Sequence, residues 1–330
     1  MEKKYTKVQI GKIDLDTVVA AYLFRVTRKD KVEVLKNCQA VEENLANPQI
    51  LCIEVGGSGR IAEGNFDHHN MPIVPAGVGT IYSACRQAWA VAPCHYCGGR
   101  YDDPERLPYI AWGPELGTAC ENGENKRVAR AVEYIDCLDT RGPEVLGRRQ
   151  TNSFPTLSDI FSGMLLVVRD PVEQLHCGVE ILQEIVEHGL GGINPYGRMP
   201  VEEIPEWRVW AETKSANNRQ ITEAVKLAQH GTTQSGLKMA WLETDFFGAP
   251  GALYGVGAQI VVAFSPHFGP NRVPKFTVAG NDIRVDAVLP ELNAREPGWG
   301  GPATGTIIGS PREGSKMTLS EVVEIVKRVL

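Results

Sequence analysis

The chain has 330 residues, of which 43% are hydrophobic and 22% are charged, and its formal net charge is −6. This length accommodates one large domain or two of ordinary size, and the composition is that of a globular protein. The negative charge argues against a broad surface for long DNA or RNA. A metal ion or a local basic cluster can still bind a short phosphorylated ligand.

The sequence has no feature of an exported or membrane protein. No apolar run approaches the roughly 20 residues that a membrane-spanning helix needs. Residues 1–5 are polar and contain no signal-peptide core. Eight cysteines without such a signal are typical of reduced thiols. We therefore expect a cytoplasmic protein that does not bind membranes.

Strand and helix patterns alternate through the N-terminal part. Short, mainly apolar segments predict strands at residues 8–10 and 32–35, and a continuous apolar run predicts a buried strand at residues 50–53. Helical periodicity predicts helices at residues 14–24, 40–45, 77–89 and 128–137. This alternation predicts an α/β fold with a doubly wound, mainly parallel sheet.

A segment rich in Gly and Pro, residues 189–205, separates the two predicted domains. We expect a first domain over residues 1–190 and a second, smaller α/β domain over residues 205–330. The elements expected around and after this segment are helices at 171–188 and 207–230, strands at 237–242, 258–264 and 275–278, and a last helix that begins at the capping box Thr318/Glu321.

Acidic residues follow several of the apolar runs, and one of them precedes a pair of histidines. The residues concerned are Asp14, Asp16, Glu54, Asp67, His68 and His69. The carboxyl ends of parallel strands share one edge of the sheet, where ligands bind. Carboxylates and imidazoles together suit Mn²⁺, Mg²⁺, Fe²⁺ or Co²⁺. Two such ions held close together would clamp a phosphate and activate a water molecule.

In this order, the segments resemble the motifs of the DHH phosphoesterase superfamily. Asp14-Leu15-Asp16-Thr17 resembles the first motif, Glu54-Val55-Gly56-Gly57 the second and Phe66-Asp67-His68-His69 the third. Residues 132–140 resemble the fourth motif, and Gly298-Trp299-Gly300-Gly301 resembles the glycine-rich signature of the associated DHHA1 domain. The resemblance implies a metal-dependent hydrolase, usually Mn²⁺-dependent, of the phosphoesterase or pyrophosphatase kind.

The resemblance also implies a role for each matching residue. The implied metal ligands are Asp14, Asp16, Glu54, His68 and either Asp136 or Asp139. Glu54 would bridge the two ions, which Asp14 and Asp16 would bind separately. His69 would contact the substrate phosphate, and Asp67 would orient the side chain of His68.

Two positions depart from the family pattern. Ile10 lies where many members have a His or Asn ligand, and Glu54 replaces Asp, which moves the carboxylate by about 1.5 Å. Our hypothesis is that Lys12 places its ammonium group near this weakened site and takes part in catalysis, with one or two ions of Mn²⁺, Mg²⁺ or Co²⁺. The alternative is a catalytically silent homologue that binds a phosphorylated ligand as a sensor.

The C-terminal part supplies candidate substrate-binding residues. Trp299 offers a ring for base stacking beside Gly300 and Gly301. Arg312 and Lys316 offer positive charge for a phosphate or carboxylate, although an ordinary Gly/Pro turn explains this segment equally well. We expect a small phosphorylated molecule or a short oligonucleotide to bind between the domains, and we consider a homodimer possible.

A second candidate metal site is the C-x-x-C pair of Cys94 and Cys97. With Cys85 and Cys120 this pair would supply four thiolates for a structural Zn²⁺. The spacing does not match a double C-x-x-C knuckle, and Cys85 falls in a predicted helix, where burial is the commoner fate. A redox dithiol is the third possibility. The remaining isolated histidines, which we expect to be surface or satisfied core groups, are His176, His188, His230 and His267.

Overall fold

The computed structural model describes residues 5–35, 40–56, 60–67, 83–91, 123–141, 154–190, 197–269, 272–301 and 305–330. The chain forms two compact units, Met1–Lys214 and Ser215–Leu330. The division falls inside helix α9 (Pro205–Val225). It therefore lies after the Gly- and Pro-rich segment, residues 189–205, at which the sequence suggested the boundary. One unit has a parallel sheet and the other, smaller unit has a mixed sheet with helices, which confirms the expected α/β fold class.

The first unit contains a four-stranded sheet in which all neighbouring strands are parallel. The strand order is β2 (Val32–Val34), β1 (Lys7–Ile10), β3 (Ile50–Ile53), β4 (Asn65–Phe66). From the inner strand β1 the chain passes through α1 (Leu15–Leu23) to β2, and then through α2 (Glu42–Leu45) to β3 on the other side of β1. The carboxyl ends of β1 and β3 thus lie where the strand order reverses, the usual ligand position in such sheets.

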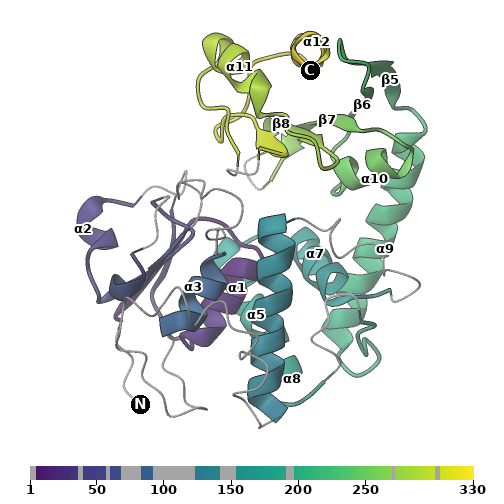
Figure 1. Ribbon diagram of the computed structural model, residues 1–330. Coiled ribbons are helices and arrows are strands. Elements are labelled where there is room, and N and C mark those ends of the chain that lie inside the picture. The colour runs from purple at the N-terminus through teal and green to yellow at the C-terminus, as the bar shows by residue number, and fades with distance from the viewer. Residues whose placement is uncertain are drawn as a thin grey trace. The chain divides into compact units, whose positions relative to one another are not determined.

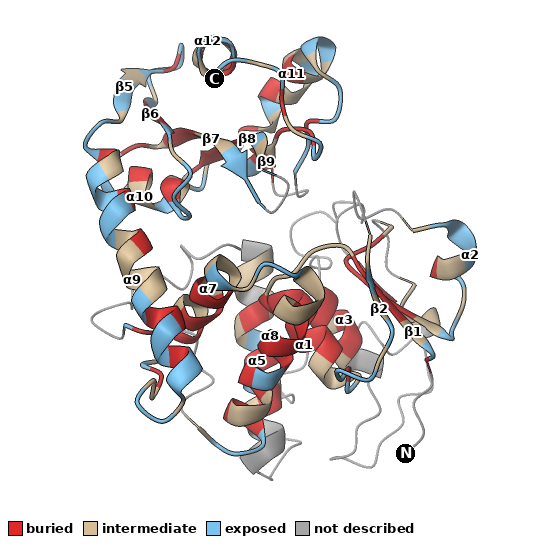
Figure 2. Cartoon of the chain, turned by 180° about the vertical axis from the view of Figure 1, so that it is seen from behind, coloured by how far each residue is buried: buried red, intermediate tan, exposed pale blue. Residues whose placement is uncertain are grey.

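Helices cover both faces of this sheet. In Figure 1, α1, α3 (Ala84–Val91), α5 (Gly123–Arg141) and α8 (Pro171–Val186) lie side by side, and α2 lies apart from them. Figure 2 shows buried residues concentrated in β1 and in the helices α1, α3 and α8. Val8 and Ile10 contribute to this large core, whereas Leu45 of α2 packs with Cys52 and Val55 in a small separate cluster.

Helix α7 (Leu157–Val167) packs closely against the first part of α9. A Cβ atom at Gly163 would lie 2.0 Å from the carbonyl oxygen of Trp210, so only glycine permits this approach. Trp207 and Trp210 are buried in the core of the first unit. This contact explains why the start of α9 belongs to the first unit.

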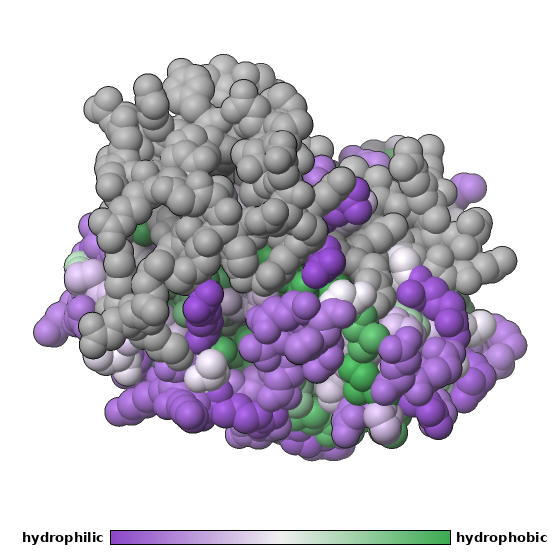
Figure 3. Space-filling model, turned by 90° about the horizontal axis from the view of Figure 1, so that it is seen from below, coloured by the Kyte–Doolittle hydropathy of each residue, from purple (hydrophilic) through white to green (hydrophobic). Residues whose placement is uncertain are grey.

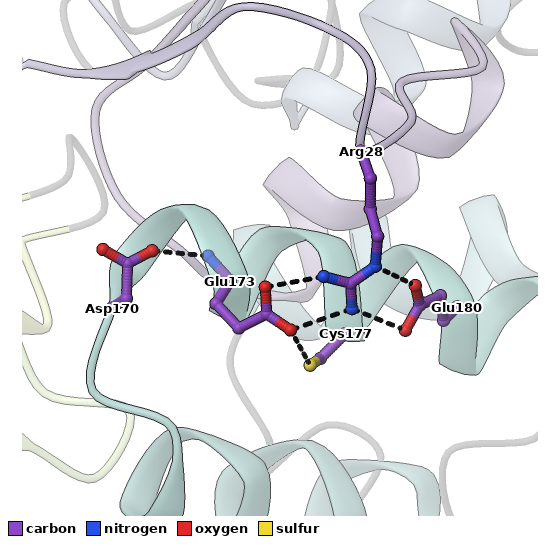
Figure 4. Close-up of polar contacts among 5 residues, drawn as sticks. All are labelled: Arg28, Asp170, Glu173, Cys177 and Glu180. Carbon is purple, nitrogen blue, oxygen red and sulfur yellow. Dashed lines mark hydrogen bonds and ion pairs between the residues drawn. The ribbon is translucent and has the colours of Figure 1, made fainter.

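Arg28 ties the turn after α1 to α8 (Figure 4). Its guanidinium donates to Glu173 from Nη1 and Nη2, at 2.6 and 2.8 Å, and to Glu180 from Nε and Nη2, at 2.7 and 3.1 Å. The sulfur of Cys177 donates to Glu173 over 3.6 Å. The side chain of Arg28 is 50% exposed, so this network lies in water.

The second unit contains a five-stranded mixed sheet. Its strands, in spatial order, are β5 (Gln229–Thr232), β6 (Lys238–Glu243), β7 (Ile260–Phe268), β8 (Val273–Gly280) and β9 (Ile307–Gly309). Strands β6 and β7 are parallel, with α10 (Ala249–Gly255) between them in the chain, and the other pairs are antiparallel. Helices α11 (Leu289–Arg295) and α12 (Leu319–Val329) pack on one face.

Two predictions for this unit have different outcomes. Helix α12 begins at the capping box of Thr318 and Glu321, as predicted. The helix predicted over residues 207–230 is wrong at its end, because α9 stops at Val225. Gln229 and His230 pair with β6 instead, so sheet formation overrides helix propensity there.

Within the described part of the chain, no helix is both long enough and apolar enough to cross a membrane. Figure 3 shows one face of the molecule on which hydrophilic side chains cover most of the described surface, with hydrophobic residues visible between them.

Candidate active site

Backbone hydrogen bonds hold together the carboxyl ends of three strands in the first unit. The amide of Gly11 donates to the carbonyl of Ile53 at 3.1 Å, which ties the end of β1 to β3. The amide of Glu54 donates to the carbonyl of Phe66 at 2.8 Å, which ties the end of β3 to β4. The predicted site residues that follow these strands therefore share one edge of the sheet.

The ammonium group of Lys12 lies between two carboxylates at this edge. Its Nζ is 2.9 Å from Oδ2 of Asp14 and 3.0 Å from Oε2 of Glu54. Burial acts to lower the pKa of Lys12, but Asp14, Glu54 and Asp139 outweigh it and raise that pKa well above its usual value. Lys12 is therefore a protonated cation, and its position agrees with the one that the sequence suggested.

Glu54 reaches Lys12 from a strained backbone position. Its φ is +58°, in the left-handed region that costs a non-glycine residue about 1–2 kcal/mol. Its side chain is 0% exposed. Burial raises the pKa of Glu54 well above its usual value, Lys12 opposes this, and the neighbouring carboxylates of Asp16 and Asp14 add to it. The ammonium group thus offsets the like charges among which this carboxyl group is buried.

The Asp14-x-Asp16 pair caps two different helices. Oδ1 of Asp14 accepts from the amide of Thr17 at 2.8 Å and caps α1. Asp16 is buried, and its two oxygens accept from the amides of Ala84 and Cys85, each at 2.8 Å, at the start of α3. Burial and the nearby charge of Asp14 raise the pKa of Asp16. The first aspartate thus faces Lys12 while the second faces the positive end of α3.

The two candidate fourth-motif acids on α5 face different partners. Asp136 accepts from the amide of Ser83 at 3.0 Å and from Nη1 of Arg86 at 3.2 Å, so it faces the start of α3. Burial, followed by the charge of Asp16, raises the pKa of Asp139 to about 8. Asp139 also interacts with the ammonium described above. This arrangement favours Asp139 as the acid that faces the centre.

Asp67 is fixed from α3 by the side chain of Gln87. The amide of Asp67 donates to Oε1 of Gln87 at 3.2 Å, and Nε2 of Gln87 donates to the carbonyl of Asp67 at 3.0 Å. Asp67 is 1% exposed. The predicted residues that lie outside the described part of the chain are His68, His69, Cys94, Cys97 and Cys120. Their proposed roles stay predictions.

Cys85, the fourth residue of the predicted zinc site, lies fully buried in α3. Burial and then the charge of Asp16 raise the pKa of its thiol well above the usual value. A raised pKa disfavours the thiolate that a metal would bind. Packing, the commoner fate of a helical cysteine, accounts for Cys85.

The donor atoms at the sheet edge are carboxylate oxygens, whose chemistry suits a hard divalent cation. Within the described residues, however, no three His, Cys, Asp or Glu side chains are arranged to hold a metal ion. Asp14 and Glu54 face Lys12, and Asp16 faces α3. One ion fits only with a ligand from outside the described residues, such as His68. A second ion between Asp14 and Glu54 does not fit.

In the second unit, Glu296 joins the two candidate substrate-binding segments. Its Oε2 accepts from Nε1 of Trp299 at 3.2 Å and from Oγ of Ser315 at 2.6 Å, and its Oε1 accepts from the amide of Lys316 at 2.6 Å. The glycine-rich segment and the loop at residues 311–316 are therefore neighbours. The side chains of Arg312 and Lys316 are exposed there.

The glycine-rich segment is built into the core of the second unit. Trp299 is 5% exposed, and its ring lies 5.8 Å from that of Phe276, so the structure gives this tryptophan a packing role in place of base stacking. The backbone of Gly300 pairs with β9. A Cβ atom at Gly301 would lie 2.1 Å from the carbonyl oxygen of Ile307, so glycine is needed for this close approach.

One polar cluster in the second unit was not predicted. His267, which the sequence suggested would stand alone, has its Nδ1 2.8 Å from Oδ2 of Asp245. Oδ1 of Asp245 accepts from the hydroxyl of Ser265 at 2.8 Å and from the amide of His267 at 2.9 Å. Asp245 and His267 are 22 residues apart: Asp245 follows β6, and His267 lies near the end of the parallel strand β7, so no local sequence pattern predicts the contact.

Comparison with solved structures gives weak neighbours, among them the two below. No family model matches the chain, and no curated protein matches it. An uncharacterized protein from Helicobacter pylori G27 is similar at 11% identity and a TM-score of 0.30, over 98% of this chain and 99% of that one. A structure described as a DHH domain, from a member of the s1p family of ribosomal proteins, is similar at 13% identity and a TM-score of 0.43. The match covers 98% of this chain and 86% of that one.

These scores are too low for the neighbours to carry an argument about the site. The geometry of this chain's own residues must therefore support any function. The domain that the second neighbour's description names is the one whose motifs the sequence of this chain resembles.

Proposed function

We propose that the chain hydrolyses a phosphodiester or phosphoanhydride bond in a small phosphorylated molecule or a short oligonucleotide. The observation that carries this proposal is the convergence of acidic residues and Lys12 at the edge where β1 and β3 end. Such an edge is where α/β sheets of this topology bind ligands. The strongly shifted pKa values of Glu54 and Asp139 are also typical of functional sites.

The residues at this edge divide the work between charge and positioning. Lys12 supplies a fixed positive charge for the negative charge that develops on a phosphoryl group. Asp16 and Asp139, with the predicted ligand His68, would hold one divalent ion, preferably Mn²⁺. When bound, this ion would lower the pKa of a water molecule for attack on phosphorus. His69 would contact the substrate phosphate, and the exposed Arg312 and Lys316 are the proposed phosphate-binding cations of the second unit.

The direct test is hydrolysis of short oligonucleotides and of pyrophosphate by the full chain after reconstitution with Mn²⁺. Asp139→Asn should lower kcat by about 100-fold or more, because it removes the acid that faces the centre. Asp282→Asn, an exposed position with φ +53° that asparagine also adopts, is the matched control and should retain activity. Equal activity of Asp139→Asn and the wild type would contradict the proposal.

A second function, binding of a phosphorylated ligand without turnover, is favoured by a separate observation. The described side chains supply no complete metal site, and both oxygens of Asp14, both of Asp16 and Oε2 of Glu54 already have partners within the protein. A catalytically silent sensor would bind a nucleotide or short oligonucleotide and release it unchanged. Calorimetric binding without any product on the same sample would identify this alternative.

A further inference from the structure

The position between Asp14 and Glu54 holds a cation that belongs to the protein. Nζ of Lys12 lies within 3.0 Å of one oxygen from each carboxylate. An ion that bridged these two oxygens would compete with the ammonium for both of them, and the two cations would repel each other at this separation. We propose that Lys12 takes the place of one divalent ion, so that the centre binds at most one metal ion per chain. This inference rests on the proposed function above.

The backbone holds Lys12 and Glu54 in register. The amide of Gly11 donates a hydrogen bond to the carbonyl of Ile53, the residue before Glu54, and the amide of Glu54 donates one to the carbonyl of Phe66 in β4. The ammonium group and the carboxylate therefore cannot separate by loop movement alone without the loss of hydrogen bonds at the sheet edge. Asp14 is held on the other side because it caps α1 through Thr17.

Burial distinguishes this arrangement from an ordinary surface ion pair. The side chain of Glu54 is 0% exposed, so Lys12 is placed to neutralise a carboxylate that water does not reach. Lys7, at the start of the strand β1 that leads to Lys12, makes an ordinary pair with Glu33 at 2.5 Å, in which the side chains are 26% and 45% exposed. Lys7 is therefore a matched control for Lys12.

The experiment is a Mn²⁺ titration of the full chain by calorimetry, with elemental analysis after gel filtration. Wild type, Lys7→Met and Lys12→Arg should each bind about one Mn²⁺ or none, because all three keep a cation at position 12. Lys12→Met should bind about one ion more than the wild type, and Mn²⁺ should raise its Tm by more. Lys12→Gln, which removes the charge but keeps a polar side chain, should give the same gain if Lys12→Met does not fold.

Two results would overturn the inference. One is two Mn²⁺ per wild-type chain. The other is a count that stays at the wild-type value in both Lys12→Met and Lys12→Gln. Hydrolysis measured on the same samples separates this inference from the proposed function. If Lys12→Gln binds an extra ion but no sample hydrolyses a substrate, the role of Lys12 is supported and the proposed hydrolase activity is contradicted. If the wild type binds two ions and hydrolyses a substrate, the activity is supported and the role of Lys12 is contradicted.

Discussion

The first unit contains two ion networks, and in each of them one cation lies between two carboxylates. One network lies at the buried sheet edge, and the other lies in water. They are Lys12 with Asp14 and Glu54, and Arg28 with Glu173 and Glu180. The guanidinium makes four hydrogen bonds of 2.6–3.1 Å (Figure 4), and the ammonium makes two ion pairs. A count of contacts would therefore rank the Arg28 network as the stronger one.

Burial reverses this ranking. Glu173 and Glu180 are 42% and 49% exposed, so water and salt screen their attraction to Arg28, and either carboxylate keeps its hydration if the pair breaks. Glu54 is fully buried, so loss of Lys12 would remove a counter-charge that water cannot replace. The first network is suited to hold charge for a ligand, and the second to hold a turn against a helix.

The largest effect should follow the loss of the cation at the sheet edge. Lys12→Met should lower the free energy of unfolding by about 2–3 kcal/mol, because it removes the ammonium that neutralises two neighbouring carboxylates. The 36% exposure of Lys12 places the effect below the range of about 3–5 kcal/mol for fully buried pairs. Urea unfolding of the metal-free protein measures it. Lys7→Met is the control. If Lys12→Met lost no more free energy of unfolding than Lys7→Met, buried and exposed pairs would not differ here.

A smaller effect is expected for the exposed network. Arg28→Met should cost less than about 1 kcal/mol, because pairs of this kind are screened by water. The cost should shrink further at high salt, whereas that of Lys12→Met should change little. Urea unfolding at low and high sodium chloride tests both statements. A salt-independent loss above about 2 kcal/mol would show that four hydrogen bonds outweigh exposure.

The smallest effect concerns the pH response beside the exposed network. Burial lowers the pKa of His176, and the nearby Arg28 lowers it further. The charged groups around this histidine are Arg28, Asp30, Glu173 and Glu180. A lowered pKa means that the stability contributed by neutral His176 is complete above about pH 6.5 and is lost as the pH falls through the lower folded value.

His176→Gln should therefore lose less stability than the wild type between pH 7 and pH 5, by less than about 1 kcal/mol. Thermal unfolding at both pH values measures this difference. The exposed His230→Gln is the control and should follow the wild type. Parallel pH profiles of His176→Gln and the wild type would show that Arg28 and its partners, not the histidine, set the acid response.

The sequence predicts three of the four strands of the first unit because each lies in a short, mainly apolar segment, and β1 and β3 are followed by acidic residues. Asp14, Glu54 and Asp67 were expected on one edge for this reason, and the structure places each of them after a parallel strand. Helix α7 and the two-residue strand β4 were not predicted: β4 is too short to be recognised, whereas the capping box of Thr156 and Asp159 at the start of α7 is a local signal that could have revealed the helix.

The partners within the site depend on strand order, which no local pattern contains. Lys12 meets Glu54 because β1 pairs with β3 and not only with β2. Asp16 meets α3 through contacts 68 and 69 residues apart in the chain. The burial of Trp299 likewise follows from packing against Phe276, whereas its sequence neighbours indicate only a glycine-rich loop.

We expect the ammonium group of Lys12 at the buried sheet edge to hold the carboxylate of Glu54 more strongly than the exposed guanidinium of Arg28 holds that of Glu173. Two double-mutant cycles measured by urea unfolding test it most directly: Lys12→Met with Glu54→Gln, and Arg28→Met with Glu173→Gln. We expect a coupling energy of about 2 kcal/mol for the first pair and below about 1 kcal/mol for the second. Equal coupling energies, or a larger value for the pair with Arg28, would contradict it.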